Sequence, residues 1–338
     1  MTRRGENRPA GGVAKAPWAG VRLHVVTGKG GAGKTTVASA LAIALAGSGR
    51  RVLLVEVEER QGLAQVLDVA PLSYEEQPVA TVTGGGKVLA MAVDPHAALM
   101  EYLALYTKIR RAGKTLERIG AVDFATTVAP GLRDVLLTGK IFEAVRRRAK
   151  NDFVYDAVVV DAPPTGRITR FLGVSTDVAG LAKVGPIHRQ AEAITTLFRS
   201  RRTVVHLVTL LEEMPAQETI EAVDALWRAK FPIGGIVINA GRAPMLRHKE
   251  VVAVREGAID SESIGKELSS VGLDNEVTAQ LLLDEGNDYA QRLMLERRAR
   301  RMLHRLDRPI FDLPLIEGGV DVAGVHELAA ELRAQGAA

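Results

Sequence analysis

The sequence predicts an α/β fold, a mostly parallel sheet flanked by helices, with an inserted helical subdomain. Short apolar segments alternate with helical ones along the chain, which is typical of parallel strands that are buried on both faces. A glycine-rich run joins the first strand to the first helix, and two stretches, about 97–150 and 180–199, show helical periodicity alone. We therefore expect one domain over residues 21–338, in which these two stretches pack together as the helical subdomain.

The expected elements follow one another in a regular order. Seven short apolar segments are expected as strands: 21–26, 51–57, 88–93, 155–161, 204–210, 233–239 and 309–313. Periodicity predicts helices at 36–46, from 94 to about 150, at 180–199, 216–230, about 276–306 and 325–333. The glycine run 84–86 lacks a following Lys and Ser or Thr, so it predicts a turn. Residues 243–275 are polar and weakly patterned, and we expect an irregular insertion there.

The run after the first strand fits the phosphate-binding pattern G-x-x-x-x-G-K-[ST]. Glycines let backbone amides turn toward phosphate oxygens, Lys34 reaches the β- and γ-phosphates, and the Thr35 hydroxyl can ligate Mg²⁺. Because the loop opens a helix, the phosphates also meet the positive end of its dipole. A merely flexible glycine loop is disfavoured by the strand–loop–helix order. The sequence therefore predicts a P-loop with these nucleotide-binding residues: Gly28, Lys29, Gly30, Gly31, Ala32, Gly33, Lys34, Thr35 and Thr36.

A second candidate element is Asp161-Ala-Pro-Pro-Thr-Gly166, at the carboxyl end of the strand expected at 155–161. Ligands of α/β sheets bind at the carboxyl ends of strands. An aspartate there can hold Mg²⁺ through its water shell, and the Gly166 amide can sense the γ-phosphate and move on hydrolysis. An ordinary turn is the alternative, since Pro-Pro-Thr-Gly has good turn chemistry. With the P-loop upstream, we predict Asp161 and Thr35 as the magnesium site.

With these motifs the chain resembles a known family. The extra lysine of the loop, Lys29, is the signature of deviant Walker A ATPases of the SIMIBI type. The segment 161–166 resembles switch II of the arsenite-pump ATPase and tail-anchored-protein targeting family. The likeness covers roughly residues 21–332 and points to the actinobacterial anion-transporting ATPase-like branch. Further matching segments are Val93–Pro95, Glu212–Glu213 with Glu218–Thr219, Val237–Asn239 and Leu313–Leu315.

The resemblance implies an ATPase that uses ATP and Mg²⁺ and works as a nucleotide-dependent dimer. In this family the extra lysine reaches the partner's nucleotide, so Lys29 would act in trans, as an arginine finger does. The asparagine that matches Asn239 reads adenine, and the segment that matches Pro314 and Leu315 lines the base pocket. Asn239 could also mark no more than the end of a strand.

The chain departs from this family at the first switch. The family usually has Asp-Pro-Ala-His there, whose aspartate positions the attacking water, whereas this chain has Glu58-Glu-Arg-Gln61. Glu58 could do this with a longer side chain, Glu56 and Gln61 are alternatives, and an exposed charged turn would need none of them. Hydrolysis is therefore expected to be slow, or the chain binds ATP mainly to regulate a partner. The predicted catalytic residues are Lys29, Lys34, Glu58 and Asp161.

Switch II differs as well, because Arg167 stands where the family commonly has histidine. An arginine near the γ-phosphate could stabilise its charge. A surface arginine followed by Arg170 is the alternative.

The amino-acid composition limits the kinds of ligand and partner that we expect this chain to bind. Lys and Arg number 44 against 40 Asp and Glu, a net charge of +4 that is too weak to imply nucleic-acid binding. The chain has no cysteine, which excludes a thiol-bound metalloid and the cysteine-held zinc that clasps the targeting-factor dimer. The chain contains no run of about 18 consecutive apolar residues, so the sequence predicts no transmembrane helix. Residues 1–20 lack the apolar core of a signal peptide, so we expect a disordered leader and a cytoplasmic protein.

Three functions compete. The first is a dimeric ATP-hydrolysing P-loop ATPase, a homodimer or a heterodimer with a paralogous ATPase. It would couple its nucleotide state to a client or a membrane protein, and could sit at the membrane through that partner. The second is a hydrolytically weak regulatory subunit paired with an active paralogue. The third is a partitioning-type positioning ATPase, which the helical insertions disfavour.

Two helical segments bear on the partner. The helix around 292–305 is rich in arginine and fits an acidic partner or an anionic membrane, although a packed amphipathic helix with a solvated basic face explains it too. Between residues 97 and 200 the only methionine is Met100, so a Met-rich groove for client helices is disfavoured.

Overall fold

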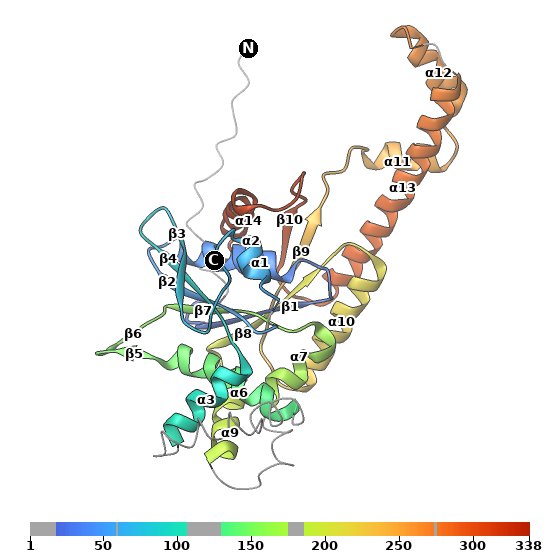
Figure 1. The fold of residues 1–338 in the computed structure, drawn as a ribbon. Coiled ribbons are helices and arrows are strands. Elements are labelled where there is room, and N and C mark those ends of the chain that lie inside the picture. The colour runs from blue at the N-terminus through green and yellow to red at the C-terminus, as the bar shows by residue number, and fades with distance from the viewer. Residues whose placement is uncertain (1–17, 59, 107–129, 175–185, 274–275) are drawn as a thin grey trace, which may run out of the picture.

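The computed structural model describes residues 18–58, 60–106, 130–174, 186–273 and 276–338, and within them eight strands form the main sheet. The strand order is β10-β9-β8-β1-β7-β2-β4-β3, and neighbours are parallel except β3 with β4. The predicted α/β fold with a mostly parallel sheet is confirmed (Figure 1). The strands are β1 (Leu23–Gly28), β2 (Arg51–Glu56), β3 (Gln77–Thr81), β4 (Lys87–Ala92), β7 (Ala157–Asp161), β8 (Thr203–Thr209), β9 (Ile233–Gly241) and β10 (Ile310–Pro314).

Helices cover both faces of this sheet (Figure 1). One face packs against α1 (Lys34–Ala46), α2 (Gly62–Val66) and α14 (Val322–Ala334). Helix α1 lies between the sheet and α14, so every residue from Val37 to Ala46 is buried and the helix is apolar all round. The other face packs against α6 (Pro130–Arg146), α7 (Thr165–Leu172), α9 (Pro186–Phe198) and α10 (Glu213–Arg228).

The helical stretches of the sequence analysis contribute α6, α9 and α3 (Pro95–Tyr106). Helix α6 contacts both α3 and α9, and α6 and α9 also cover the sheet. The helix expected to continue to about residue 150 ends at Arg146, because a short hairpin of β5 (Arg148–Ala149) and β6 (Asp152–Phe153) follows. Residues 107–129 and 180–185, which belong to the predicted subdomain, lie outside the described residues.

The prediction of an irregular insertion over 243–275 is wrong. This region forms α11 (His248–Arg255) and α12 (Ser261–Ser270), which pack on the long α13 (Glu276–His304). Helix α12 starts because the Asp260 carboxylate accepts a hydrogen bond from the Ser263 amide at 2.8 Å, a cap that the weak apolar pattern obscured. We call residues 260–273, which include α12, together with residues 276–288 of α13 the arm, and the arm projects away from the sheet (Figure 1).

Besides the hairpin of β5 and β6, three short elements carried too little periodicity to be predicted: α2, α7 and the edge strand β3. β3 contains Pro78 and pairs with β4 through the glycine turn, in which Val82 N–H donates to Gly86 O at 2.8 Å. The turn predicted at 84–86 is therefore confirmed. Gly86 is required there, because a Cβ would lie 1.9 Å from the Ala46 carbonyl oxygen.

The described part of the chain begins at Trp18, inside the stretch 1–20 that was expected as a leader, and residues 1–17 lie outside it. The Trp18 indole is buried and its Nε1–H donates to Ala337 O at 2.9 Å. It meets the ring of Phe311 edge to face at 5.6 Å between centroids. This tryptophan thus joins the chain before β1 to the end of α14, which composition could not show.

Candidate functional site

The glycine-rich loop lies between β1 and α1, as predicted. Gly31 and Gly33 have φ of 84° and 86°, in the left-handed region that favours glycine. A Cβ on Gly33 would also lie 2.2 Å from the Asn239 amide nitrogen, and one on Gly28 would lie 2.2 Å from Val208 O. Backbone conformation and close packing therefore both require glycine at this loop. Gly30 and Gly31 are exposed at its rim, where backbone amides remain open to a ligand.

The sheet order places the loop next to switch II. β1 lies between β7 and β8, so Gly28 and Asp161 end adjacent parallel strands. The Thr27 hydroxyl donates to Pro163 O at 2.7 Å and fixes the start of switch II against the P-loop. Gly166 lies in the first turn of α7, whose N-terminus follows switch II directly. Lys34, Thr35 and Thr36 form the first turn of α1 and are partly exposed.

Thr35 and Asp161 meet at the centre of the site. The Thr35 hydroxyl donates to Asp161 Oδ2 at 2.7 Å, and the buried Oδ1 atom of the same carboxylate has no hydrogen-bond partner. Burial raises the pKa of Asp161 to about 6, against the opposing effects of the Thr35 hydrogen bond and the Lys34 charge. A hydroxyl and a carboxylate oxygen are hard oxygen donors of the kind that Mg²⁺ prefers. The two side chains therefore fit the predicted magnesium site.

Lys29 contacts a helix that lies far from the P-loop in the sequence. Its ammonium forms an ion pair of 2.8 Å with Glu218 of α10, and both side chains are about one-third exposed. The lysine is thus presented at the surface beside the P-loop. Glu218 was singled out in the sequence only as a matching feature, and its contact with Lys29 joins residues that lie far apart in the chain.

Switch I contains three candidate groups, and the structure separates them. The buried Glu56 carboxylate accepts hydrogen bonds from the amides of Arg60, Gly62 and Leu63 at 2.9–3.2 Å, so it organises the turn before α2. The Gln61 side chain is bonded to both backbone groups of Leu72, at 2.7 and 3.0 Å. The side chains of Glu56 and Gln61 are therefore already hydrogen-bonded to backbone groups.

Glu58, the third candidate, faces switch II. Its carboxylate lies 3.9 Å from the Arg167 guanidinium, which is 61% exposed. The two switches thus meet through this ion pair across the mouth of the site. Glu58 can turn toward a ligand at the cost of a weak, solvated contact, whereas Glu56 would have to release three backbone amides.

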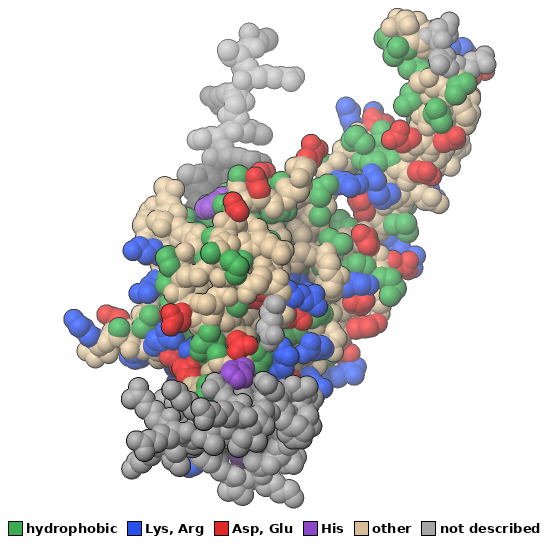
Figure 2. Space-filling view, viewed as in Figure 1, with side chains coloured by type: hydrophobic (Ala, Val, Ile, Leu, Met, Phe, Trp, Pro, Cys, Tyr) green, Lys and Arg blue, Asp and Glu red, His purple; other side chains and the backbone are tan. Residues whose placement is uncertain are grey.

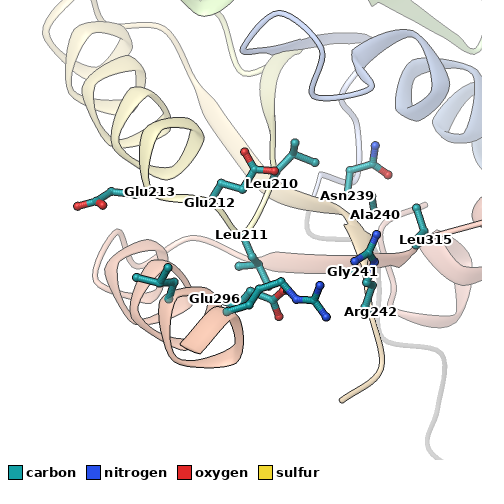
Figure 3. Close-up of a pocket in the computed structure, with 12 residues that line it drawn as sticks. Leu210, Leu211, Glu212, Glu213, Asn239, Ala240, Gly241, Arg242, Glu296 and Leu315 are labelled. Atoms are coloured by element: carbon teal, nitrogen blue, oxygen red, sulfur yellow. The ribbon is translucent and has the colours of Figure 1, made fainter. Parts of the chain in front are cut away.

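Asn239 lies in β9, two residues before the strand ends at Gly241, and touches the P-loop. Its amide donates to Ala32 O at 3.0 Å. The same residue lines a pocket of about 340 Å³ beyond the loop, within the size range of small-molecule sites (Figure 3). Leu315, one of the two residues expected at the base, also lines it, whereas Pro314 ends β10 and is not among the lining residues. The pocket is lined by Leu210, Leu211, Glu212, Glu213, Asn239, Ala240, Gly241, Arg242, Arg292, Leu295, Glu296 and Leu315.

Helix α13 supplies a wall of this pocket that sequence reasoning missed. Arg292, Leu295 and Glu296 of α13 line it together with Glu212 and Glu213 at the start of α10. Arg292 lies 3.8 Å from Glu296, one turn along the same helix. These residues follow the P-loop by some 250 positions, and no spacing rule connects the two segments. Only the packing of α13 against α10 brings them to the site.

None of the described helices combines the length and the apolar character that crossing a membrane requires.

Comparison with known proteins agrees with this geometry. Residues 21–199 match the family model described as anion-transporting ATPase. The ATPase BagA of Mycobacterium tuberculosis is 49% identical over 319 residues, which are 94% of each chain. The arsenical pump-driving ATPase of Escherichia coli is 28% identical over 232 residues, 63% of this chain and 38% of that one. The ATPase GET3 of Chaetomium globosum is 26% identical over 296 residues, 85% and 81% of the two chains.

The predicted resemblance is thereby confirmed, since the matched region contains the P-loop, both switches and the residues that bring Thr35 and Asp161 together. The chain belongs to the anion-transporting ATPase family and is a P-loop ATPase of the type that includes the arsenical pump-driving ATPase and GET3.

Proposed function

We propose that this chain binds ATP with Mg²⁺ and hydrolyses it slowly as a dimer, and that its nucleotide state controls a partner protein. The observation that carries the proposal is the 2.7 Å contact between Thr35 and Asp161 at the mouth of the P-loop, with the second carboxylate oxygen buried and unpartnered. A buried polar atom without a partner costs free energy. A ligand that takes up this oxygen explains why it is tolerated.

The phosphates would lie over the loop amides from Gly30 to Thr35, at the positive end of the α1 dipole. Lys34 would neutralise the β- and γ-phosphates, and the Gly166 amide, in the first turn of α7, would follow the γ-phosphate. Thr35 and Asp161 would hold the magnesium ion, which supplies charge neutralisation of the phosphates when bound. Asn239 and Leu315 would contact the base, because both line the pocket beyond the loop.

Glu58 is the proposed water-positioning group. Its carboxylate contacts only the exposed Arg167 among the ion pairs of the described residues, while the other two switch I candidates are bonded to backbone groups. A glutamate has one more rotatable bond than the aspartate usual in the family, so its carboxylate is held less firmly. We therefore propose slow hydrolysis.

Lys29 is the proposed contribution to the partner's site. Its ammonium forms an ion pair with Glu218 of α10, and its side chain is about one-third exposed. A lysine in that position can neutralise a second nucleotide across an interface, as an arginine finger does. The dimer partner, a second copy or a paralogue, would in turn supply a lysine to this chain's nucleotide.

Isothermal titration calorimetry with ATP and Mg²⁺ tests the binding step. Wild type should release heat with a one-to-one stoichiometry, and Lys34→Ala should weaken binding at least about tenfold, the effect of removing roughly 1.4 kcal/mol. Lys87→Ala, an exposed lysine at the start of β4, is the matched control and should bind as wild type does. No heat from the wild type, or equal binding by Lys34→Ala, would refute the proposal.

A further inference from the structure

The arm exposes an unusual amount of apolar surface. Five large apolar side chains within the segment 271–282 are between 43% and 70% exposed: Val271, Leu273, Val277, Leu281 and Leu282. Helix α12 buries no side chain, and Ala279 is the one buried residue among the described positions 277–288 of α13. A two-helix hairpin with so small a core gains little from its own packing. The apolar surface of the arm is therefore expected to be covered by another molecule.

The charges of α13 divide the helix into two halves of opposite sign. Residues 276–288 include four acidic residues and no basic one, while residues 289–304 include five arginines and one glutamate. The helix dipole favours such a polarity only within the first and last turns. Here the acidic and basic halves each extend over about three turns or more. When two copies of α13 lie antiparallel, the acidic half of each helix faces the basic half of the other.

The outward face of α13 repeats this polarity in a narrow stripe. Positions 277, 281, 284, 288, 292 and 295 are separated by three or four residues, so they lie on one face of the helix. All six side chains are exposed, and they run from apolar through acidic to basic and apolar. Figure 2 shows apolar and acidic side chains side by side on the visible face of the arm.

We propose that the arm docks on α13 of a second copy of this chain, with the two helices antiparallel about a twofold axis near Asp288. In this register Leu281 of one copy meets Leu295 of the other, and Asp284 meets Arg292. A twofold interface makes each contact twice. Asp288 lies near the axis, where it faces Asp288 of the partner subunit, and on each helix Arg292 lies about one turn from this carboxylate. A parallel arrangement would place acidic half against acidic half and is excluded by repulsion.

The chemistry of the surface favours a second copy over a membrane. An anionic membrane repels an acidic surface, and the arm between 260 and 273 has one lysine against three acidic residues. The basic half of α13 supplies the complementary charge within the same chain. Arg292 and Leu295 also line the pocket beyond the P-loop, so the docked arm would lie along the rim of the partner's nucleotide site. The contact itself requires no nucleotide and in this respect goes beyond the proposed function.

Sedimentation velocity of the full chain without nucleotide, from about 1 to 100 μM, tests the apolar part of the contact. Wild type should dimerise, and Leu281→Asp should weaken the dimer at least about tenfold, as removal of a central apolar contact does. Val320→Asp, at an exposed valine outside the arm, is the matched control and should leave the dimer unchanged.

Exchanging the charges at positions 284 and 292 tests the proposed antiparallel register of the two α13 helices. Asp284→Arg and Arg292→Glu should each weaken the dimer, because each places like charges opposite one another. An equimolar mixture of the two variants should dimerise as wild type does, since both facing pairs are again opposite in charge. A monomeric wild type, a dimer indifferent to these changes, or a mixture that fails to recover would overturn the inference. A dimer that forms only with ATP and ignores the arm variants would overturn it and leave the proposed function standing.

Discussion

Glu58 is the switch I residue to which we assign the proposed water-positioning role. Its carboxylate lies within 3.9 Å of Arg167 across the mouth of the site, and the neighbouring Glu56 is committed to backbone amides. The structure therefore reduces three candidates for the water-positioning group to one that can move toward the nucleotide.

Replacing Glu58 by alanine should lower ATP turnover at least about tenfold, the lower range for loss of a general base or water-positioning group. Binding of ATP should stay within a factor of about three, because the ion pair of Glu58 is with Arg167 of switch II and its proposed role is in hydrolysis. Steady-state phosphate release and calorimetry measure the two quantities. Arg60→Ala, in the same turn, serves as control; an unchanged turnover of Glu58→Ala would remove this residue from the mechanism.

Two buried histidines form a second residue-level feature. His24 Nδ1 and His206 Nε2 lie 3.1 Å apart, and the Gly235 N–H donates to the remaining His206 nitrogen at 3.4 Å. The rings stack with centroids 5.4 Å apart, and Trp18 meets His206 edge to face. Burial lowers the pKa of both imidazoles, that of His206 to about 3. Both histidines are therefore neutral in the folded protein at neutral pH.

Stability should fall as the pH decreases from about 6.5 toward 3, because the unfolded chain takes up protons there while the folded chain does not. At pH 5 the loss from His206 alone is about 2 kcal/mol. Urea unfolding at pH 7.5 and pH 5 measures it. The double variant His24→Gln with His206→Gln keeps polar side chains that do not titrate, so the difference between the two pH values should shrink. An equal loss in this variant would assign the effect to other groups.

At the level of elements, the P-loop is held open by backbone conformation and by its neighbour β9. Gly33 combines a φ of 86° with a space that Asn239 fills. The Asn239 amide nitrogen also bonds Ala32 O, so displacement of this side chain breaks a hydrogen bond of the loop. Gly30 has neither constraint: a Cβ there would meet nothing within 4 Å.

Gly33→Ala should therefore destabilise the nucleotide-free protein by at least about 1 kcal/mol, the cost of a left-handed conformation for a residue with a Cβ. Gly30→Ala should change the free energy of unfolding by less than about 0.5 kcal/mol. Chemical unfolding without nucleotide compares the two variants. Equal stability of the pair would show that the loop relaxes away from Asn239 without cost.

At the scale of the whole molecule, the proposed dimer makes each active site a product of two chains. Lys29 and Lys34 belong to the same loop, yet they are proposed to serve different nucleotides. The ion pair between Lys29 and Glu218 is consistent with this division, since it joins Lys29 to α10 and leaves its side chain partly exposed.

Mixing two inactive variants tests whether Lys29 and Lys34 of one chain act on different nucleotides. Lys29→Ala and Lys34→Ala should each lose most ATP turnover, whereas an equimolar mixture should regain up to about a quarter of wild-type turnover, because half of the dimers contain one complete site. Turnover is measured at concentrations above the dimer dissociation constant, with each variant alone at the same total concentration as control. No gain in the mixture would mean that Lys29 acts on its own chain or that the partner is not a second copy.

The sequence alone determined the alternation of strands and helices, the P-loop with Thr35, and the aspartate at the end of β7. These features depend on short stretches of sequence. A glycine-rich loop and a buried apolar strand each favour their own backbone conformation, whatever the rest of the chain does. The helices of the region 243–275 escaped prediction because their apolar pattern is weak and their caps, such as Asp260, act through single hydrogen bonds. Residues 107–129 and 180–185 were predicted as helical and lie outside the described residues.

The tertiary structure decided which distant residues share the site. It brought Glu218 to Lys29, Asn239 to Gly33 and α13 to the rim of the pocket, and it withdrew Glu56 and Gln61 into backbone contacts. Such contacts depend on strand order and on how helices pack, which no local pattern encodes. Residue types and spacing therefore predicted a phosphate-binding loop, whereas the fold alone decided which distant side chains lie beside that loop.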